Sequence, residues 1–237
     1  MVIDDNLISL HIGEETLRTE ALRRISGKPL LLLHFEVTAA AMDLLDVFRQ
    51  YPTNDEDTKV KQALGIRLFN AHAAAIKLML SGYYQNATMV LRDVLETIFL
   101  ADYFRTSPAE VERWRMADKK TLLRDFKPAI IRGKLDARDG VTTKKRGDAY
   151  ALFSGLAGHA SMEGFAMLRP LGKDMHTGPF LDNSALEAVA AEMGKLSVQV
   201  GEIFSAFTPL DWGLGRDTAA AFAPLKMKWL KATGFIK

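Results

Sequence analysis

The feature that most limits how this chain can fold is a long apolar seam between residues 184 and 207. Apolar residues follow one another there at steps of three and four for about three heptads, which places them on one side of an α-helix. The seam consists of Leu186, Val189, Met193, Leu196, Val200, Ile203 and Phe207. A stripe of small residues lies beside it, at Ala190, Gly194, Ser197 and Gly201. A second helix can therefore pack very closely, and the pattern leaves open whether that helix comes from the same chain or from another copy.

A second long helix is predicted over residues 83–105, where helical spacing continues for about six turns. Its apolar face carries polar residues: Arg92 and Glu96 lie one turn apart on the flank, and Asp102 lies near the centre. No stretch shows the alternation typical of a strand. We therefore expect an all-α protein, a helical bundle of about seven to nine helices. Its central helices are expected at residues 54–82, 83–105, 148–161 and 184–207.

Local signals predict where helices begin and how the chain is divided. The pairs Thr53/Glu56 and Ser184/Glu187 have the spacing of a capping box, and residues 107–110 combine a cap serine, a first-turn proline and a glutamate. A single domain over residues 1–237 is expected, with its core at about 29–207. The helices at 14–26 and 216–232 are expected to be peripheral, and the Gly- and Pro-rich segment 164–183 to be a long loop.

Composition narrows the class of protein. The chain is 48% apolar and 25% charged, which is typical of a soluble globular protein and excludes a disordered one. A net charge of +2 permits a nucleic-acid partner without requiring one. The absence of cysteine excludes disulfides and thiolate sites and fits a reducing compartment. Residues 1–6 lack the pattern of a signal peptide, and no apolar run is long enough to span a bilayer. We expect a cytoplasmic protein with no membrane partner.

Several familiar chemical sites are missing from the sequence. It has no phosphate-binding glycine loop, no His-Glu-x-x-His motif and no nucleophile elbow. His34 and Glu36 have the spacing of zinc deaminases, whose other ligands are cysteines. We therefore expect neither a metal nor a cofactor.

Two sets of polar residues are candidates for a site. Arg92 and Glu96 form either a structural ion pair or a fixed cation for an anionic group that Glu96 orients. Tyr150 and Ser154 share one face of the helix predicted at 148–161, and His159 lies about a third of a turn away. His159 is either a proton carrier or a hydrogen-bonded core histidine.

Two further features leave alternatives open. Asp102 is a buried partner for His159 or for an arginine, or else a solvated residue near its helix end. The segment 124–146 contains eight Arg or Lys against three Asp, which indicates either a solvated surface or a nucleic-acid patch.

The motif Gly82-Tyr-x-x-x-Ala-x-x-x-Leu-Arg-x-x-x-Glu96, followed by Tyr150-x-x-x-Ser-x-x-x-x-His159, resembles an uncharacterised group of bacterial helical proteins related to the HEPN-like superfamily. The resemblance covers roughly residues 60 to 165. It implies a helical bundle that dimerises and an Arg-x4–6-His motif that cleaves RNA without a metal, often in toxins or phage defence. Two such spacings occur, Arg67 to His72 and Arg169 to His176. Leu68 follows Arg67 where the family has a polar residue, and five residues of ideal helix rotate His72 about 140° from Arg67.

Two functions follow as expectations. The first is an RNA-directed protein of defence or stress responses, which either cleaves RNA without a metal or binds RNA. Its catalytic candidates are Arg92, Glu96, Tyr150, Ser154 and His159, with Arg67, His72 and Asp102 as secondary candidates. The second is a non-catalytic helical module that binds a small molecule or a partner protein, in which the same polar residues fix the helix register. The expected partners are RNA or a small anionic ligand, together with a second copy in a homodimer.

Overall fold

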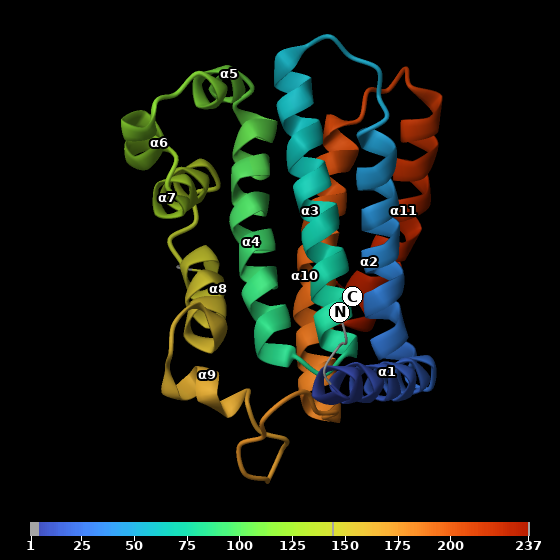
Figure 1. Ribbon diagram of the computed structural model, residues 1–237. Helices are drawn as coiled ribbons and strands as arrows, with labels where there is room; N and C mark the ends of the chain where they lie inside the picture. The colour runs from blue at the N-terminus through green and yellow to red at the C-terminus, as the bar shows by residue number, and fades with distance from the viewer. Residues whose placement is uncertain (1–4, 144, 237) are drawn as a thin grey trace.

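Four long helices form the centre of the protein in a computed structural model, which describes residues 5–143 and 145–236. They are α2 (Pro29–Phe48), α3 (Glu56–Leu80), α4 (Tyr84–Thr106) and α10 (Asn183–Phe207). Each packs against the next in that order, and α10 packs back on α2, so the four helices close a bundle (Figure 1). All regular structure in the described residues is helical, which confirms the all-α class.

The remaining helices surround this bundle. α1 (Asp5–Ser26) crosses its base, and α11 (Gly213–Ala232) packs along α2 (Figure 1). A series of short elements covers the outside of α4. These are α5 (Ala109–Arg115), α6 (Lys119–Asp125), α7 (Pro128–Arg138), α8 (Lys145–Phe153), the π-helix η1 (Ser154–Gly158) and α9 (Met162–Ala166). The described residues thus contain eleven α-helices, more than the seven to nine predicted, because residues 109–138 fold into three short helices.

The described part of the chain omits a few residues on which predictions were made. Residues 1–4, in the N-terminal stretch without a signal-peptide pattern, lie outside it, as do residues 144 and 237 of the expected single domain. Among the described helices, α3 alone is long and apolar enough by length and composition to cross a membrane. Here it packs between α2 and α4.

The small-residue stripe of α10 is filled by helices of the same chain. A side chain on Gly194 would lie 2.9 Å from both His34 Nδ1 on α2 and Trp229 Nε1 on α11. A side chain on Gly201 would lie 2.1 Å from Phe222 Cζ on α11. The close neighbours left open by the sequence are therefore α2 and α11, and no second copy is needed to fill the stripe.

The C-terminal helix lies outside the four-helix bundle, as expected of a peripheral helix, but the expected end of the core near residue 207 is wrong. Phe222 and Trp229 of α11 are each only 2% exposed and belong to the same apolar cluster as α2 and α10, so the core extends well beyond residue 207. α1 is more peripheral: Ala21 and Ile25 are its buried residues, and it starts at Asp5 rather than near Glu14. Burial of the one face of α11 that carries these aromatic residues is enough to hold the helix against the bundle, although lysines occupy its other face.

Helix caps differ from the predicted residues. Asp55, not Thr53, caps α3, since its carboxylate accepts the Thr58 N–H at 2.8 Å. Asp182, not Ser184, caps α10 and accepts the Ala185 N–H at 2.9 Å. Ser107 gives α5 no side-chain cap. An ionised carboxylate is a stronger acceptor than a hydroxyl, and for α3 and α10 one lies within two residues of the predicted cap.

Candidate functional site

Polar residues from four elements meet on the outer side of α4. We call this group the Tyr150 cluster. It consists of Arg92 and Glu96 from α4, Arg132 from α7, Tyr150 from α8 and Ser154 from the π-helix. α4 packs directly on α7, α8 and the π-helix, which brings segments almost sixty residues apart into contact.

Tyr150 is the centre of these contacts. Arg92 Nη2 donates a hydrogen bond of 2.6 Å to the Tyr150 hydroxyl, and this bond raises the pKa of Arg92. The Arg92 and Arg132 guanidinium carbons lie 5.0 Å and 4.1 Å from the Tyr150 ring centroid, within cation–π range. Glu96 pairs with Arg92 at 3.3 Å. Arg92 therefore has the geometry of both predicted alternatives, the structural ion pair and the fixed cation.

Three polar atoms of the cluster are buried without a hydrogen-bond partner among the described residues: Arg92 Nε, Arg132 Nη1 and Ser154 Oγ. Arg132 also makes no ion pair within that part of the chain. The cluster therefore holds two guanidinium groups against one carboxylate, and its unused groups are N–H donors and a hydroxyl. Buried polar groups without partners are rare and costly, which suggests a site for an acceptor from outside the chain.

The π-helix brings Gly158 against Arg92, with Ser154 beside the same glycine. Its wider turn places Gly158 so close to α4 that a side chain there would lie 3.0 Å from Arg92 Nη1 and 3.5 Å from Ser154 Cβ. π-Helical turns are uncommon and occur often at functional sites. The predicted helix over 148–161 is therefore wrong in its second half, where α-helical hydrogen bonding ends at Phe153. It was also expected in the central bundle, but it lies outside α4, and α2 occupies that place in the bundle (Figure 1).

His159 does not join the cluster. It follows the π-helix in an extended conformation, with φ −146° and ψ 161°, and is exposed. No hydrogen bond or ion pair connects it to another described residue. Because the π-helix ends at Gly158, the rotation expected from an ideal helix does not apply to His159.

The secondary candidates lie apart from one another. His72 is fully buried, its Nδ1 lies 2.8 Å from the Leu68 carbonyl oxygen, and burial lowers its pKa. Arg67 is exposed and pairs with Asp93. The two therefore share no substrate-accessible site within one chain. Asp102 pairs with Arg105 and Arg138, so an arginine is its partner, which was one of the predicted alternatives.

Arg132 is the cluster residue that sequence reasoning missed. It lies in the basic segment 124–146, where its charge is one of many. The signal that could have found it is Ile131 and Leu135, four residues apart and both buried, which mark an amphipathic helix with Arg132 beside its apolar face. No group of three or more His, Asp or Glu within residues 5–143 and 145–236 is arranged to hold a metal ion.

Comparisons of the chain with family models, with curated proteins and with solved structures find no match in any of the three.

Proposed function

We propose that this protein is a non-catalytic helical protein that binds an anionic ligand at the Tyr150 cluster. The observation that carries the proposal is the set of three buried, unpartnered polar atoms beside an excess of positive charge. A phosphate or carboxylate oxygen matches those donors, because guanidinium groups bind such anions through paired, charge-assisted hydrogen bonds.

The cluster borders solvent on the outer side of α4. The Arg92 side chain is 25% exposed, so an anion can approach from outside the bundle. Each buried group without a partner costs roughly 1–3 kcal/mol relative to a satisfied one. A ligand that accepts hydrogen bonds from Arg92 and Arg132 removes part of that cost, and this gain favours the bound state.

The two side chains of the cluster that could carry a proton, Glu96 and Tyr150, are both paired with Arg92, which favours binding over catalysis. General acid–base chemistry requires a titratable group within hydrogen-bond reach of the reacting atoms. Glu96 is held by Arg92, and no described histidine contacts the cluster. Tyr150 accepts from Arg92, which orients its hydroxyl as a binding group.

Metal-independent RNA cleavage, which the HEPN-like resemblance implies, is the second candidate function. One observation favours it: Gly158 packs against Arg92, and His159 is the next residue. The imidazole is thus attached one residue away from the contact with the arginine. Arg67 and His72 give no such support, because His72 is buried in the core.

The homodimer is proposed on the exposed face between α3 and α4. Ile66 and Met89 are 43% and 49% exposed there and border a shallow groove with Ala63, Ala71 and Val90. A second copy would cover these apolar groups. Light scattering on the purified protein should give a dimer that Ile66→Glu converts to a monomer, whereas a monomeric wild-type protein contradicts the dimer.

The cytoplasmic location stays a prediction, and cell fractionation tests it.

Calorimetry with inorganic phosphate tests the binding function. Wild-type protein should bind phosphate, and Arg132→Gln should weaken binding about tenfold, the loss of one charge-assisted contact. Arg49→Gln is the matched control, because Arg49 is an exposed arginine paired with Asp46. Circular dichroism checks that each variant is folded. No phosphate binding, or an equal loss in the Arg49 variant, overturns the proposal.

A cleavage assay decides between the two candidate functions. The protein is incubated with a single-stranded RNA in EDTA, beside His159→Ala and His72→Ala variants. We expect intact RNA in all three samples. Cleavage that His159→Ala abolishes and His72→Ala preserves would establish the ribonuclease function instead.

A further inference from the structure

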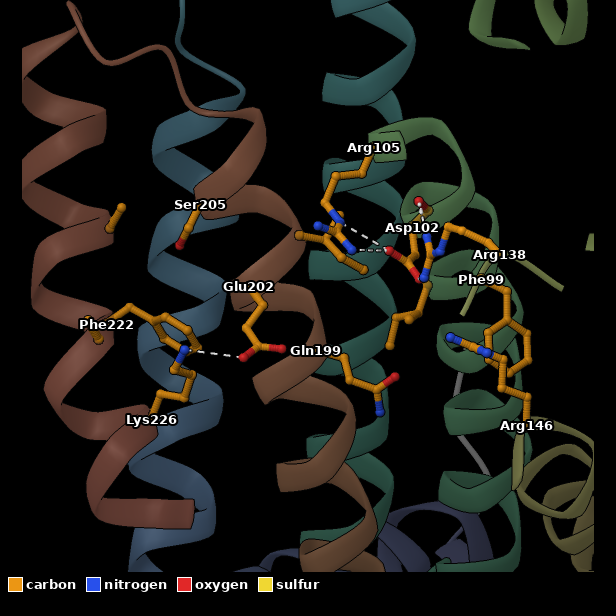
Figure 2. A pocket seen from close by; sticks show the side chains of 14 residues that line it. Phe99, Asp102, Arg105, Arg138, Arg146, Gln199, Glu202, Ser205, Phe222 and Lys226 are labelled. Atoms are coloured by element: carbon orange, nitrogen blue, oxygen red, sulfur yellow. Dashed lines mark hydrogen bonds and ion pairs between the residues drawn. The ribbon is translucent and has the colours of Figure 1, made fainter. Parts of the chain in front are cut away.

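A pocket of about 610 Å³ lies over α10, between α11 on one side and α4, α7 and α8 on the other (Figure 2). Its volume is in the range of small-molecule sites. It is separate from the Tyr150 cluster, since none of the cluster residues lines it. Figure 2 shows Lys226 and Glu202 on the α11 side, the arginines on the other side, and Gln199 between them.

The arginines of the pocket belong to a series of alternating ion pairs, which we call the arginine–aspartate chain. It runs Arg105–Asp102–Arg138–Asp139–Arg146–Asp136. The arginine–aspartate chain joins α7 and α8 to α4. It raises the pKa of Arg138, through Asp139 and then Asp102, and lowers the pKa of Asp139, through Arg138 and then Arg146. Much of the charge in segment 124–146 is thus used within the protein.

Some guanidinium nitrogens of the arginine–aspartate chain donate no hydrogen bond to another described residue. Arg138 donates from all three guanidinium nitrogens and has a structural role. Arg105 donates to Asp102 through Nε and Nη2, which leaves Nη1. Arg146 donates through Nη1 and Nη2, which leaves Nε. Lys226 makes one hydrogen bond, of 3.1 Å to Glu202. Within the described residues, three cations of the pocket therefore retain donors for a ligand.

Six apolar residues share the pocket lining with the cations and with Asp102, Gln199, Glu202 and Ser205. Ile98, Phe99, Ile203 and Phe222 form its base and are nearly buried, and Ala219 and Ala223 continue the apolar surface along α11. A small inorganic anion would accept hydrogen bonds from the spare donors but would leave the apolar surface exposed to water. A larger molecule with a charged end and an apolar body would use both.

We propose that this pocket binds an organic anion with an apolar body. The charged group is taken by the spare donors of Arg105 and Arg146, and the body lies toward Phe222 and Ala223. The proposal does not depend on the Tyr150 cluster, because the two sites share no residue.

Calorimetry with octanoate and acetate tests the proposal. Octanoate should bind the wild-type protein and acetate should not, because acetate lacks the apolar body. Arg105→Gln should weaken octanoate binding about tenfold, and Asp102 still keeps Arg138 as its partner in this variant. Ala223→Trp, at an exposed position of α11, should fill the pocket and abolish binding.

Two control variants test whether octanoate binds in this pocket and not elsewhere on the protein. Arg216→Gln removes an exposed arginine of α11 outside the pocket, and Arg132→Gln alters the Tyr150 cluster. Both should bind octanoate like the wild type. No octanoate binding, equal binding of acetate, or octanoate binding that survives both Arg105→Gln and Ala223→Trp would overturn the proposal. Thermal unfolding establishes that each variant is folded, and if Arg105→Gln is not, Ala223→Trp decides alone.

Discussion

The Trp229 indole N–H donates a hydrogen bond of 2.8 Å to His34 Nδ1 and joins α11 to α2 inside the core. Gly194 of α10 leaves the space in which both rings fit. Because Nδ1 is the acceptor, the imidazole must be unprotonated at that atom. One hydrogen bond therefore joins α11 to α2 beside α10, and it requires that His34 Nδ1 carry no proton.

Removing either partner of this bond should be costly, and removing both should cost less than the sum. Trp229→Phe leaves His34 Nδ1 buried without a donor, which should lower the free energy of unfolding by roughly 1–3 kcal/mol. His34→Leu leaves the indole N–H unpaired in the same way. Urea unfolding of both single variants and the double variant measures the coupling. Strictly additive losses would mean that the bond contributes nothing.

Stability should fall as the pH drops from 7.5 to 5.5. Burial, with a smaller contribution from Lys195, lowers the pKa of His34 below its ordinary 6.5, and burial lowers that of His72. The unfolded chain then binds protons that the folded chain does not. The stabilisation is complete above pH 6.5 and is lost as the pH falls toward the folded-state pKa values.

Urea unfolding across that pH range checks this. His72→Leu should reduce the pH dependence, and it should also stabilise the protein, since His72 Nε2 is buried without a partner among the described residues. An unchanged slope in His72→Leu would contradict the assignment to buried histidines.

Gly201→Ala should destabilise the protein strongly, by roughly 3 kcal/mol or more, because the new methyl group overlaps the Phe222 ring. Phe222→Leu in the same chain should restore part of the loss. Gly133→Ala is the matched control, since Gly133 is a helical glycine of α7 with open space around it. That change should instead stabilise by about 0.5–1 kcal/mol. Equal effects of the two glycine substitutions on thermal unfolding would refute the packing argument.

Asp102→Asn should loosen α7 from α4. Asp102 is only 14% exposed and accepts from both Arg105 and Arg138, so its neutralisation should cost roughly 1–3 kcal/mol. Hydrogen exchange should increase in α7. Asp217→Asn, in an exposed pair with Arg216, should change stability by no more than about 0.5 kcal/mol. If both variants unfold at the same denaturant concentration, the arginine–aspartate chain does not hold α7.

The sequence predicted the helices whose apolar periodicity is long. Of the seven seam residues of α10, six are buried and Phe207 is partly exposed. The helix expected over residues 83–105 is found as α4, Tyr84–Thr106. These predictions succeed because apolar spacing is local, and burial of one face is what stabilises such helices.

Features that depend on tertiary contacts could not be predicted. The π-helix at 154–158 fits Gly158 against Arg92, a contact that no local pattern specifies. Its wider turn is the reason that His159 leaves the cluster. Arg132 joins Tyr150 only because α7 packs on α4, and its position in a basic segment gave no sign of that. The docking of α11 likewise depends on Gly194 and Gly201, which lie 35 and 21 residues before the Trp229 and Phe222 rings that pack on them.

Those glycines also determine when folding can be completed. Translation proceeds from the N-terminus, so α11 is synthesised after all four helices of the bundle. Until α11 is synthesised, no aromatic ring fills the space beside Gly194 and Gly201, and His34 lacks the Trp229 N–H as its hydrogen-bond donor. A nascent chain that has not yet reached Gly213 therefore exposes an apolar groove between α2 and α10. Chaperones recognise exposed apolar surface of this kind.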